Sequence, residues 1–246
     1  AKVVAGAQSL GPMLNLRLAQ PQVLVDITAL PELTRAEQVG DDLVLGPCVT
    51  AGAIEDGRAG APGLDMLPAV AAGISYRAVR NRGTIGGSLC HADPAADWVS
   101  VLPALGAACE IAGPAGSRTV PAAAFMTAPF ETVLGPGEIL RAIRIPRPRP
   151  GARWGYGKFS RKTGKFAMAI GAVLNDPARG ILRAVLGATE GRPIVVERAE
   201  TIVPGAGAID EAQVSGLLDR AGIRDASAQQ LHIAALRRAA AMAFPA

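Results

Sequence analysis

The chain has 246 residues, half of them hydrophobic, which is enough for one large domain or two modest domains with a real core. Its formal net charge of +4 is too small to indicate a nucleic-acid partner. Three widely spaced cysteines and only two histidines argue against a disulfide framework and against a metal or iron–sulfur site in this chain. The sequence shows no signal peptide and no apolar run of membrane-spanning length, so we expect a cytoplasmic protein.

Hydrophobic patterning predicts short strands and helices over the first 145 residues. Residues 12–18 carry four apolar side chains, so we expect a short buried helix or turn there. Thr50 is placed to cap a helix, and Asp93 with Pro94 predicts the N-cap and first turn of another, whose inner face carries Trp98. In chain order the expected elements are strand 2–5, the turn or helix 12–18, strands 23–27 and 42–46, helices 50–55, 64–72 and 94–108, and strands 109–112, 118–120 and 138–145.

Alternating prolines at residues 146–151 favour an extended linker and give the strongest domain boundary in the sequence. Beyond this linker, three strand candidates are followed by two helix candidates, an order that is typical of an α+β domain. The expected strands are 153–159, 166–174 and 181–186, and the expected helices are 209–221 and 226–242.

The most distinctive stretch is residues 79–89, which holds three glycines, two hydroxyls and no acid. Glycine lets backbone N–H groups form a concave nest that binds anions, above all phosphate. An ordinary tight turn before a helix explains these residues equally well when they are taken alone. A second small-residue turn, at residues 6–12, changes this balance, because two such turns could grip one diphosphate from two sides.

Nine basic residues and no acid lie between residues 139 and 175. A solvated surface and a docking face for an anionic partner are both open interpretations of this basic run. Its members are Arg141, Arg144, Arg147, Arg149, Arg153, Lys158, Arg161, Lys162 and Lys165.

Residues 5–10, 16–18, 25–27 and 80–88, in this order and spacing, resemble the FAD-binding medium subunit of the molybdenum hydroxylases. This family includes the carbon monoxide, xanthine and nicotine dehydrogenases, and the resemblance covers nearly the whole chain. It implies an α+β fold in which residues 1–148 form a PCMH-type FAD-binding domain of two α/β subdomains. It also implies a C-terminal domain, residues 151–246, with a small antiparallel sheet and helices, and an N-terminal segment that is missing before Lys2.

The resemblance implies a non-covalent FAD in this chain, and a molybdopterin cofactor and two iron–sulfur clusters in partner subunits. The chain would pass electrons from these clusters to NAD, a quinone or another acceptor. It would do so in a dimer of heterotrimers with a large molybdopterin subunit and a small iron–sulfur subunit. We find no nucleophile–base pair and expect no catalytic side chain, because a flavin carries the redox chemistry itself. The alternatives are a free-standing FAD-dependent oxidoreductase acting on a small molecule, and a non-enzymatic assembly subunit that has lost FAD.

The resemblance also implies a set of cofactor-binding residues. Residues 3–10 and 84–88 correspond to two diphosphate loops, Ser75, Asn81 and Asp97 contribute to the pocket, and three further residues lie near the flavin ring. The expected residues are Val3, Val4, Ala5, Gly6, Ala7, Gln8, Ser9, Leu10, Ser75, Asn81, Thr84, Ile85, Gly86, Gly87, Ser88, Asp97, Leu140, Lys158 and Phe166.

Two positions depart from the family pattern. Ala7 stands where relatives most often have a second glycine, and its methyl group is well tolerated only if φ is negative. Lys165 stands at a position that is often acidic, which would add positive charge near the flavin edge and favour the reduced cofactor.

Overall fold

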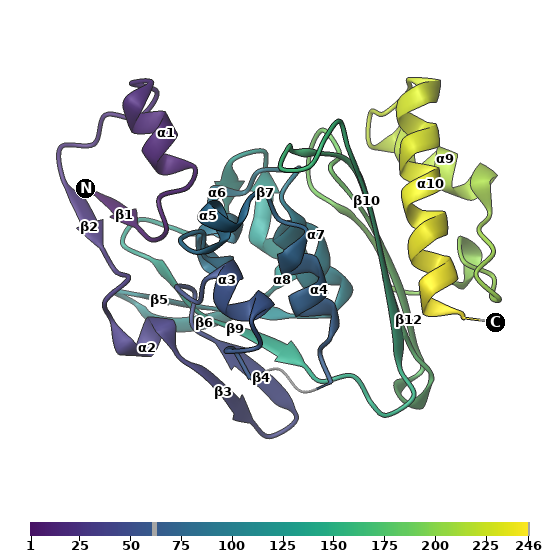
Figure 1. The fold of residues 1–246 in the computed structure, drawn as a ribbon, viewed down its shortest axis with the longest axis horizontal. Coiled ribbons are helices and arrows are strands. Elements are labelled where there is room, and N and C mark those ends of the chain that lie inside the picture. The colour runs from purple at the N-terminus through teal and green to yellow at the C-terminus, as the bar shows by residue number, and fades with distance from the viewer. Residues whose placement is uncertain (61–62, 246) are drawn as a thin grey trace.

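The structure is a computed structural model that describes residues 1–60 and 63–245. Three units follow one another along the longest axis of the molecule (Figure 1). A small parallel sheet lies at one end, an antiparallel sheet with a helical layer lies in the middle, and a second antiparallel sheet with helices lies at the other end. This arrangement confirms the predicted α+β class, with two N-terminal α/β subdomains followed by a C-terminal sheet with helices.

The N-terminal unit is a two-stranded parallel sheet whose register pairs Lys2 with Leu24. A helix and a turn lie at residues 12–18 as predicted, but Leu16 and Leu18 are 70% and 71% exposed and no residue of the helix is buried, so the expected burial is wrong. A sheet of two short strands is too small to cover the apolar face of a helix. The elements of this unit are β1 (Lys2–Val4), α1 (Leu10–Asn15), β2 (Leu24–Asp26) and α2 (Pro31–Thr34).

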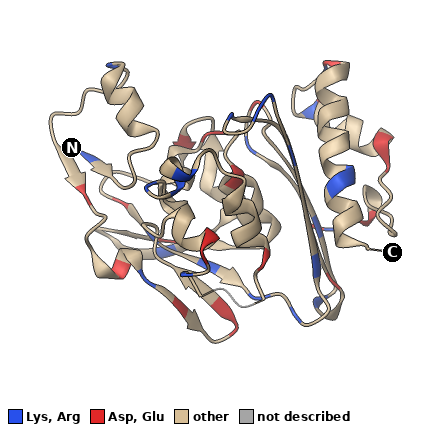
Figure 2. Ribbon diagram, viewed as in Figure 1, with Lys and Arg blue, Asp and Glu red and all other residues tan. Residues whose placement is uncertain are grey.

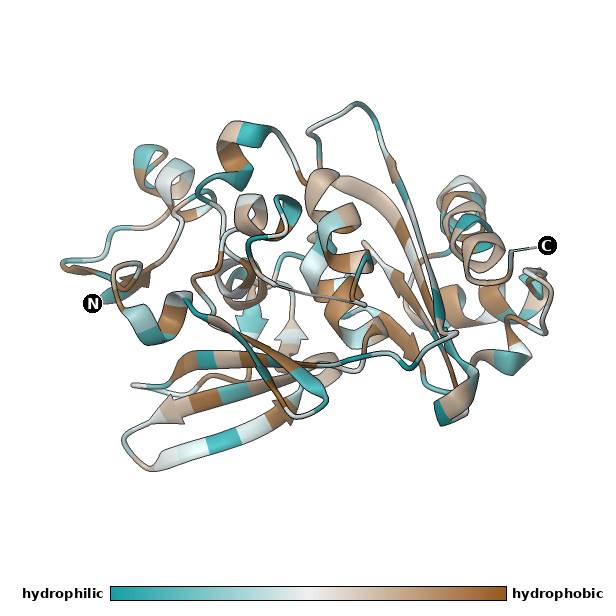
Figure 3. Cartoon of the chain, turned by 60° about the horizontal axis from the view of Figure 1, so that its bottom comes forward, coloured by the Kyte–Doolittle hydropathy of each residue, from teal (hydrophilic) through white to brown (hydrophobic). Residues whose placement is uncertain are grey.

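The middle unit is built on a five-stranded antiparallel sheet of order β3-β4-β9-β5-β6, with helices on one face (Figure 1). The strands carry both hydrophobic and hydrophilic residues (Figure 3). The core strand β4 is buried from Leu43 to Leu45, and Trp98 and Ile143 are buried between sheet and helices. The elements are β3 (Ala36–Val39), β4 (Asp42–Leu45), α3 (Ala51–Glu55), α4 (Met66–Ala72), α5 (Arg77–Arg80), α6 (Ile85–His91), α7 (Asp97–Ala104), β5 (Ala108–Gly113), β6 (Gly116–Pro121), α8 (Ala122–Phe125), β7 (Met126–Ala128), β8 (Glu131–Thr132) and β9 (Ile139–Pro146).

Two helix starts that were predicted from the sequence have different outcomes. Thr50 caps α3 as predicted, because its hydroxyl accepts a hydrogen bond from the Ala53 N–H. The predicted start of α7 at Asp93 is wrong, since the cap residue is Ala96 and the Asp93 carboxylate instead accepts from Ala95 in the preceding turn. The same helix ends before its predicted limit, because Gly106 adopts a positive φ of 71° that turns the chain into β5.

The C-terminal unit is a four-stranded antiparallel sheet of order β10-β11-β12-β13, which confirms the three predicted strands and adds a short fourth. One face of this sheet packs on α10, and the other face packs on α7 of the middle unit. Its elements are β10 (Arg153–Ser160), β11 (Ala167–Asp176), β12 (Ile181–Gly187), β13 (Ile194–Val196), α9 (Glu211–Arg220) and α10 (Ala226–Ala243).

Glycines let α10 approach this sheet very closely. A Cβ at Gly155 would lie 1.8 Å from the Ala239 carbonyl oxygen, and one at Gly157 would lie 2.3 Å from that of Ala235. Because side chains alternate along a strand, the intervening residue Tyr156 points to the opposite face, toward α7. The sheet is therefore held between α10 and the middle unit.

One hydrophobic cluster joins Trp98 of the middle unit to Ala172 and Val185 of the C-terminal sheet. The division of the chain after residue 148 therefore stays a prediction, because a shared core crosses it. Within residues 1–60 and 63–245, no helix is both long and apolar enough to cross a membrane.

Candidate functional site

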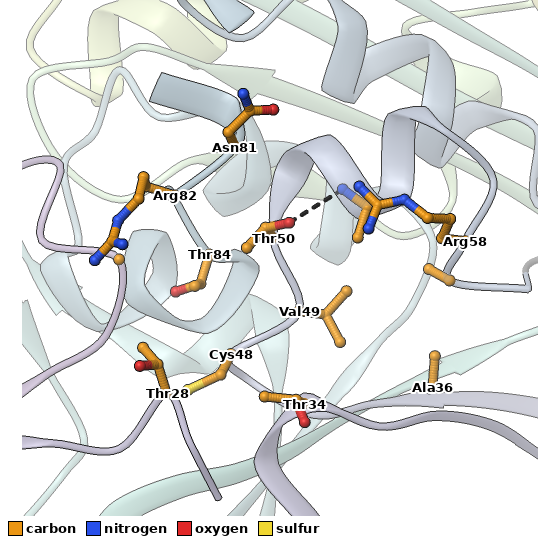
Figure 4. Close-up of a pocket in the computed structure, with 13 residues that line it drawn as sticks. Thr28, Thr34, Ala36, Cys48, Val49, Thr50, Arg58, Asn81, Arg82 and Thr84 are labelled. Atoms are coloured by element: carbon orange, nitrogen blue, oxygen red, sulfur yellow. Dashed lines mark hydrogen bonds between the residues drawn. The ribbon is translucent and has the colours of Figure 1, made fainter. Parts of the chain in front are cut away.

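A cavity of about 370 Å³ lies between the N-terminal unit and the helices of the middle unit (Figure 4). Its volume is in the usual range for small-molecule sites. Three of the predicted site residues, Gly6, Asn81 and Thr84, line it. The full lining is Gly6, Thr28, Thr34, Ala36, Cys48, Val49, Thr50, Ala53, Arg58, Ala59, Asn81, Arg82 and Thr84.

The two small-residue turns meet at this cavity, as the sequence predicted. We call residues 5–10 the first loop and residues 81–88 the second loop. A Cβ at Gly6 would lie 1.9 Å from the Arg82 carbonyl oxygen and 2.9 Å from the Gly83 Cα. Only glycine lets the two backbones approach this closely, so Gly6 sets the contact between the loops.

The second loop has most of its N–H groups bonded within the protein, and its role as a diphosphate loop stays a prediction. The N–H groups of residues 85–88 are already bonded to protein acceptors, namely the carbonyls of Val49 and Pro47 and the hydroxyl and carbonyl of Thr84. The glycine at position 86 serves packing, since a Cβ there would lie 2.2 Å from the Cβ of Pro47. The N–H groups of residues 85–88 are therefore already paired in the absence of a ligand, whereas no acceptor is seen for the Thr84 N–H within the described residues.

The first loop has the opposite character. Within the described part of the chain, none of the N–H groups of residues 6–10 has a hydrogen-bond acceptor. The Gln8 side chain bonds back to the Gly6 carbonyl and holds the loop in shape. Ala7 has a φ of 58°, so the condition under which its methyl group is well tolerated is not met. Free backbone donors are what an anionic ligand requires, and they lie on this loop.

The electrostatic character of the cavity favours an anion. Its lining contains Arg58 and Arg82 and no carboxylate. Arg58 pairs with Asp56, whereas Arg82 has no ion-pair partner in residues 1–60 and 63–245. The two arginines lie on opposite sides of the cavity, and Arg82 lies on the side of Thr84 (Figure 4). Burial, and then the charge of the nearby Asp26, raises the pKa of the Cys48 thiol to about 11, so this wall residue stays neutral.

A second polar cluster lies where β10 meets α7. The Lys158 ammonium is 2.8 Å and 3.0 Å from the two carboxylate oxygens of Asp97, and the Tyr156 hydroxyl donates to the same carboxylate. Burial, and then the Asp97 charge, raises the pKa of Tyr156 well above its usual range, so the phenol remains a donor. The structure thus brings together two predicted site residues, Asp97 and Lys158.

Sequence reasoning missed Tyr156, although a signal was present. Tyr156 and Lys158 are two residues apart on a strand and therefore share a face. We name Asp97, Tyr156 and Lys158 the seam cluster, because its members come from both sides of the linker.

The family of the chain is decided by comparison with known proteins. The model of the family described as "FAD binding domain in molybdopterin dehydrogenase" matches residues 1–148. The chain belongs to this family. The predicted resemblance to FAD-binding medium subunits is therefore confirmed, and the chain is an oxidoreductase subunit.

Named relatives and solved structures agree with this assignment. The nicotine 6-hydroxylase medium subunit of Paenarthrobacter nicotinovorans is 40% identical over 83% of this chain and 72% of its own length. The carbon monoxide dehydrogenase medium chain of Hydrogenophaga pseudoflava is 38% identical over 71% of this chain and 61% of its own. A solved carbon monoxide dehydrogenase from the same organism has a TM-score of 0.84 at 31% identity, over 98% of this chain and 88% of its own.

Three other predicted site residues of this medium subunit, Leu140, Phe166 and Ser75, are not part of the cavity lining. Leu140 is buried in the core at 3% exposure, whereas Phe166 is 72% exposed beside the tip of the β10–β11 hairpin. Ser75 has a φ of 43°, and its carbonyl accepts a hydrogen bond from Arg80. These assignments stay predictions.

The basic run is partly neutralised. Salt bridges join Arg144 to Asp42 and Glu110, and Arg149 to Asp41. Basic residues also lie at the tip of the β10–β11 hairpin, which reaches over the middle unit (Figure 2). There the Tyr76 hydroxyl donates to the Thr163 carbonyl.

Proposed function

We propose that this medium subunit holds one non-covalent FAD and relays electrons from iron–sulfur clusters of a partner subunit to an external acceptor. The observation that carries the proposal is the cavity itself, which is lined by Gly6 of the first loop and by Arg82 and Thr84 of the second loop. The N–H groups of residues 6–10 beside it have no acceptor in the described part of the chain. Bound FAD supplies chemistry that joins one-electron clusters to two-electron acceptors. The chain contributes binding, orientation and charge.

The residues present fit a dinucleotide that contains a diphosphate. The N–H groups of residues 6–10 and Arg82 would bind the diphosphate, with the Thr84 hydroxyl beside them. Val49, Ala53 and Ala59 offer an apolar wall for a flat adenine group. We place the flavin end toward the seam cluster and Phe166, on the strength of the family resemblance.

The descriptions of the relatives support a proposal for the partners. Two relatives are described as medium chains or subunits, and the solved carbon monoxide dehydrogenase is described as lacking the Mo-pyranopterin moiety of its molybdenum cofactor. We propose a large molybdopterin subunit and a small subunit with two iron–sulfur clusters, assembled as a dimer of heterotrimers in the cytoplasm. NAD, a quinone or another carrier would accept the electrons.

The relay is tested by mixing the FAD-loaded chain with its small subunit, which has first been reduced with dithionite and desalted. We expect the visible flavin absorbance to be lost at a rate that rises with small-subunit concentration. Dithionite should reduce the flavin of the isolated FAD-loaded chain, whereas the substrate of the complete complex should not. Oxidation of that substrate by the isolated chain would contradict the relay and favour a free-standing oxidoreductase.

A further inference from the structure

The seam cluster makes more polar contacts than are needed to hold the C-terminal sheet against α7. The side chains of Asp97 and Lys158 are only 7% and 16% exposed. Removing two charges from water costs more than a salt bridge of this kind usually returns, and apolar pairs hold such interfaces at least as well. The buried Asp97–Lys158 pair, which also binds the Tyr156 hydroxyl, is therefore better explained if these side chains must be held in one fixed position.

The contacts of the cluster fix one group in space. The Lys158 ammonium bonds both oxygens of Asp97, and it also donates to the Gly73 carbonyl at 3.3 Å. Each of the three N–H donors of the ammonium group therefore has an acceptor. Gly73 lies two residues before Ser75, in the segment that leads through α5 to Asn81 at the cavity. The cluster thus connects the C-terminal sheet to the segment that ends at the cavity.

We propose that Tyr156 is a positioning residue for the flavin end of the cofactor site. Its hydroxyl holds the Asp97 carboxylate in the orientation that keeps Lys158 against Gly73, and so fixes the wall that the C-terminal sheet contributes. The inference rests on the proposed function, because it requires that the flavin end lies at the seam. The adenosine diphosphate end lies in the cavity, whose lining contains no member of the cluster.

This separation of the two ends gives a sharp experiment. Apo-protein is titrated with FAD and, separately, with ADP, which reproduces only the end of the cofactor that enters the cavity. In Tyr156→Phe we expect the dissociation constant for FAD to rise about tenfold, which corresponds to losing most of one hydrogen bond to a charged group. The dissociation constant for ADP should stay within about twofold of the parent value.

Two further variants separate positioning from packing. Trp154 lies on the same face of β10 and packs on the same core without joining the cluster, so Trp154→Phe should leave the ratio of the two constants unchanged. In a Lys158→Met background, Tyr156→Phe should have no further effect on FAD, because Tyr156 acts through Lys158.

If Tyr156→Phe weakened the binding of FAD and ADP equally, Tyr156 would have only a structural role. If neither dissociation constant changed, Tyr156 would have no role in the cofactor site. Either result overturns the inference while the parent still binds both ligands. A parent chain that binds neither FAD nor ADP would instead overturn the proposed function, and the inference with it.

Discussion

The first and second loops look alike in sequence, since both are rich in small residues, yet their backbones have different tasks. In the second loop, the N–H groups of residues 85–88 are paired with Val49, Pro47 and Thr84. The first loop leaves the N–H groups of residues 6–10 without acceptors in the described structure. Gly86 therefore permits dense packing in the second loop. Gly6 permits the first loop, with its free N–H donors, to approach the second loop closely.

The largest effect is expected from Gly6→Ala, which attacks the contact between the loops. The new methyl group would lie 1.9 Å from the Arg82 carbonyl oxygen, so the first loop must move away. We expect FAD affinity to fall about a hundredfold, because the donors are displaced from the cavity. Gly11→Ala is the matched control, since no atom lies within 4 Å of its added Cβ, and it should bind FAD like the parent.

Gly86→Ala should act on folding rather than on binding. Its methyl group would meet Pro47 inside the protein, so urea unfolding of the apo-protein should show a loss of about 1–3 kcal/mol. The fraction that remains folded should bind FAD with an affinity within about threefold of the parent value. If FAD affinity fell while the free energy of unfolding stayed unchanged, Gly86 would instead contact the diphosphate directly.

The sequence was sufficient for most strands and for the cap at Thr50, because these depend on local patterns. The fold of the N-terminal part and the pairing of the two loops came from the resemblance to a known family, because they depend on contacts between residues that are distant in sequence. The sequence could not assign the glycines, since the role of Gly86 depends on Pro47, a residue brought in from elsewhere in the chain. It also placed the start of α7 at Asp93, where a local turn competes successfully for the carboxylate. Tyr156 escaped notice because its partner Asp97 is distant in sequence.

Arg82→Gln tests the charge that the second loop brings to the cavity. We expect ADP and FAD to bind about tenfold more weakly, and the dependence of binding on salt to become shallower. Arg58→Gln is the comparison, because Arg58 already pairs with Asp56 and should contribute less. The check is a pair of calorimetric titrations at low and high ionic strength. An equal effect of the two substitutions would contradict a special role for Arg82.

The smallest effect is expected from Ala7→Gly in the first loop. Glycine removes the strain of a φ of 58°, and the gain is partly offset by the greater freedom of glycine in the unfolded chain. We expect the unfolding free energy to rise by about 0.5–1 kcal/mol, and FAD to bind no more weakly than to the parent. A drop in the thermal midpoint of Ala7→Gly would show that this residue is not strained.

Amide hydrogen exchange with and without FAD tests most directly the claim that the first loop supplies the donors. In the apo-protein, the N–H groups of residues 6–10 should exchange quickly and those of residues 85–88 slowly, because only the latter have protein acceptors. Saturating FAD should strongly protect residues 6–10 and change residues 85–88 little. Protection that appears at residues 85–88 while residues 6–10 stay unprotected would contradict the account.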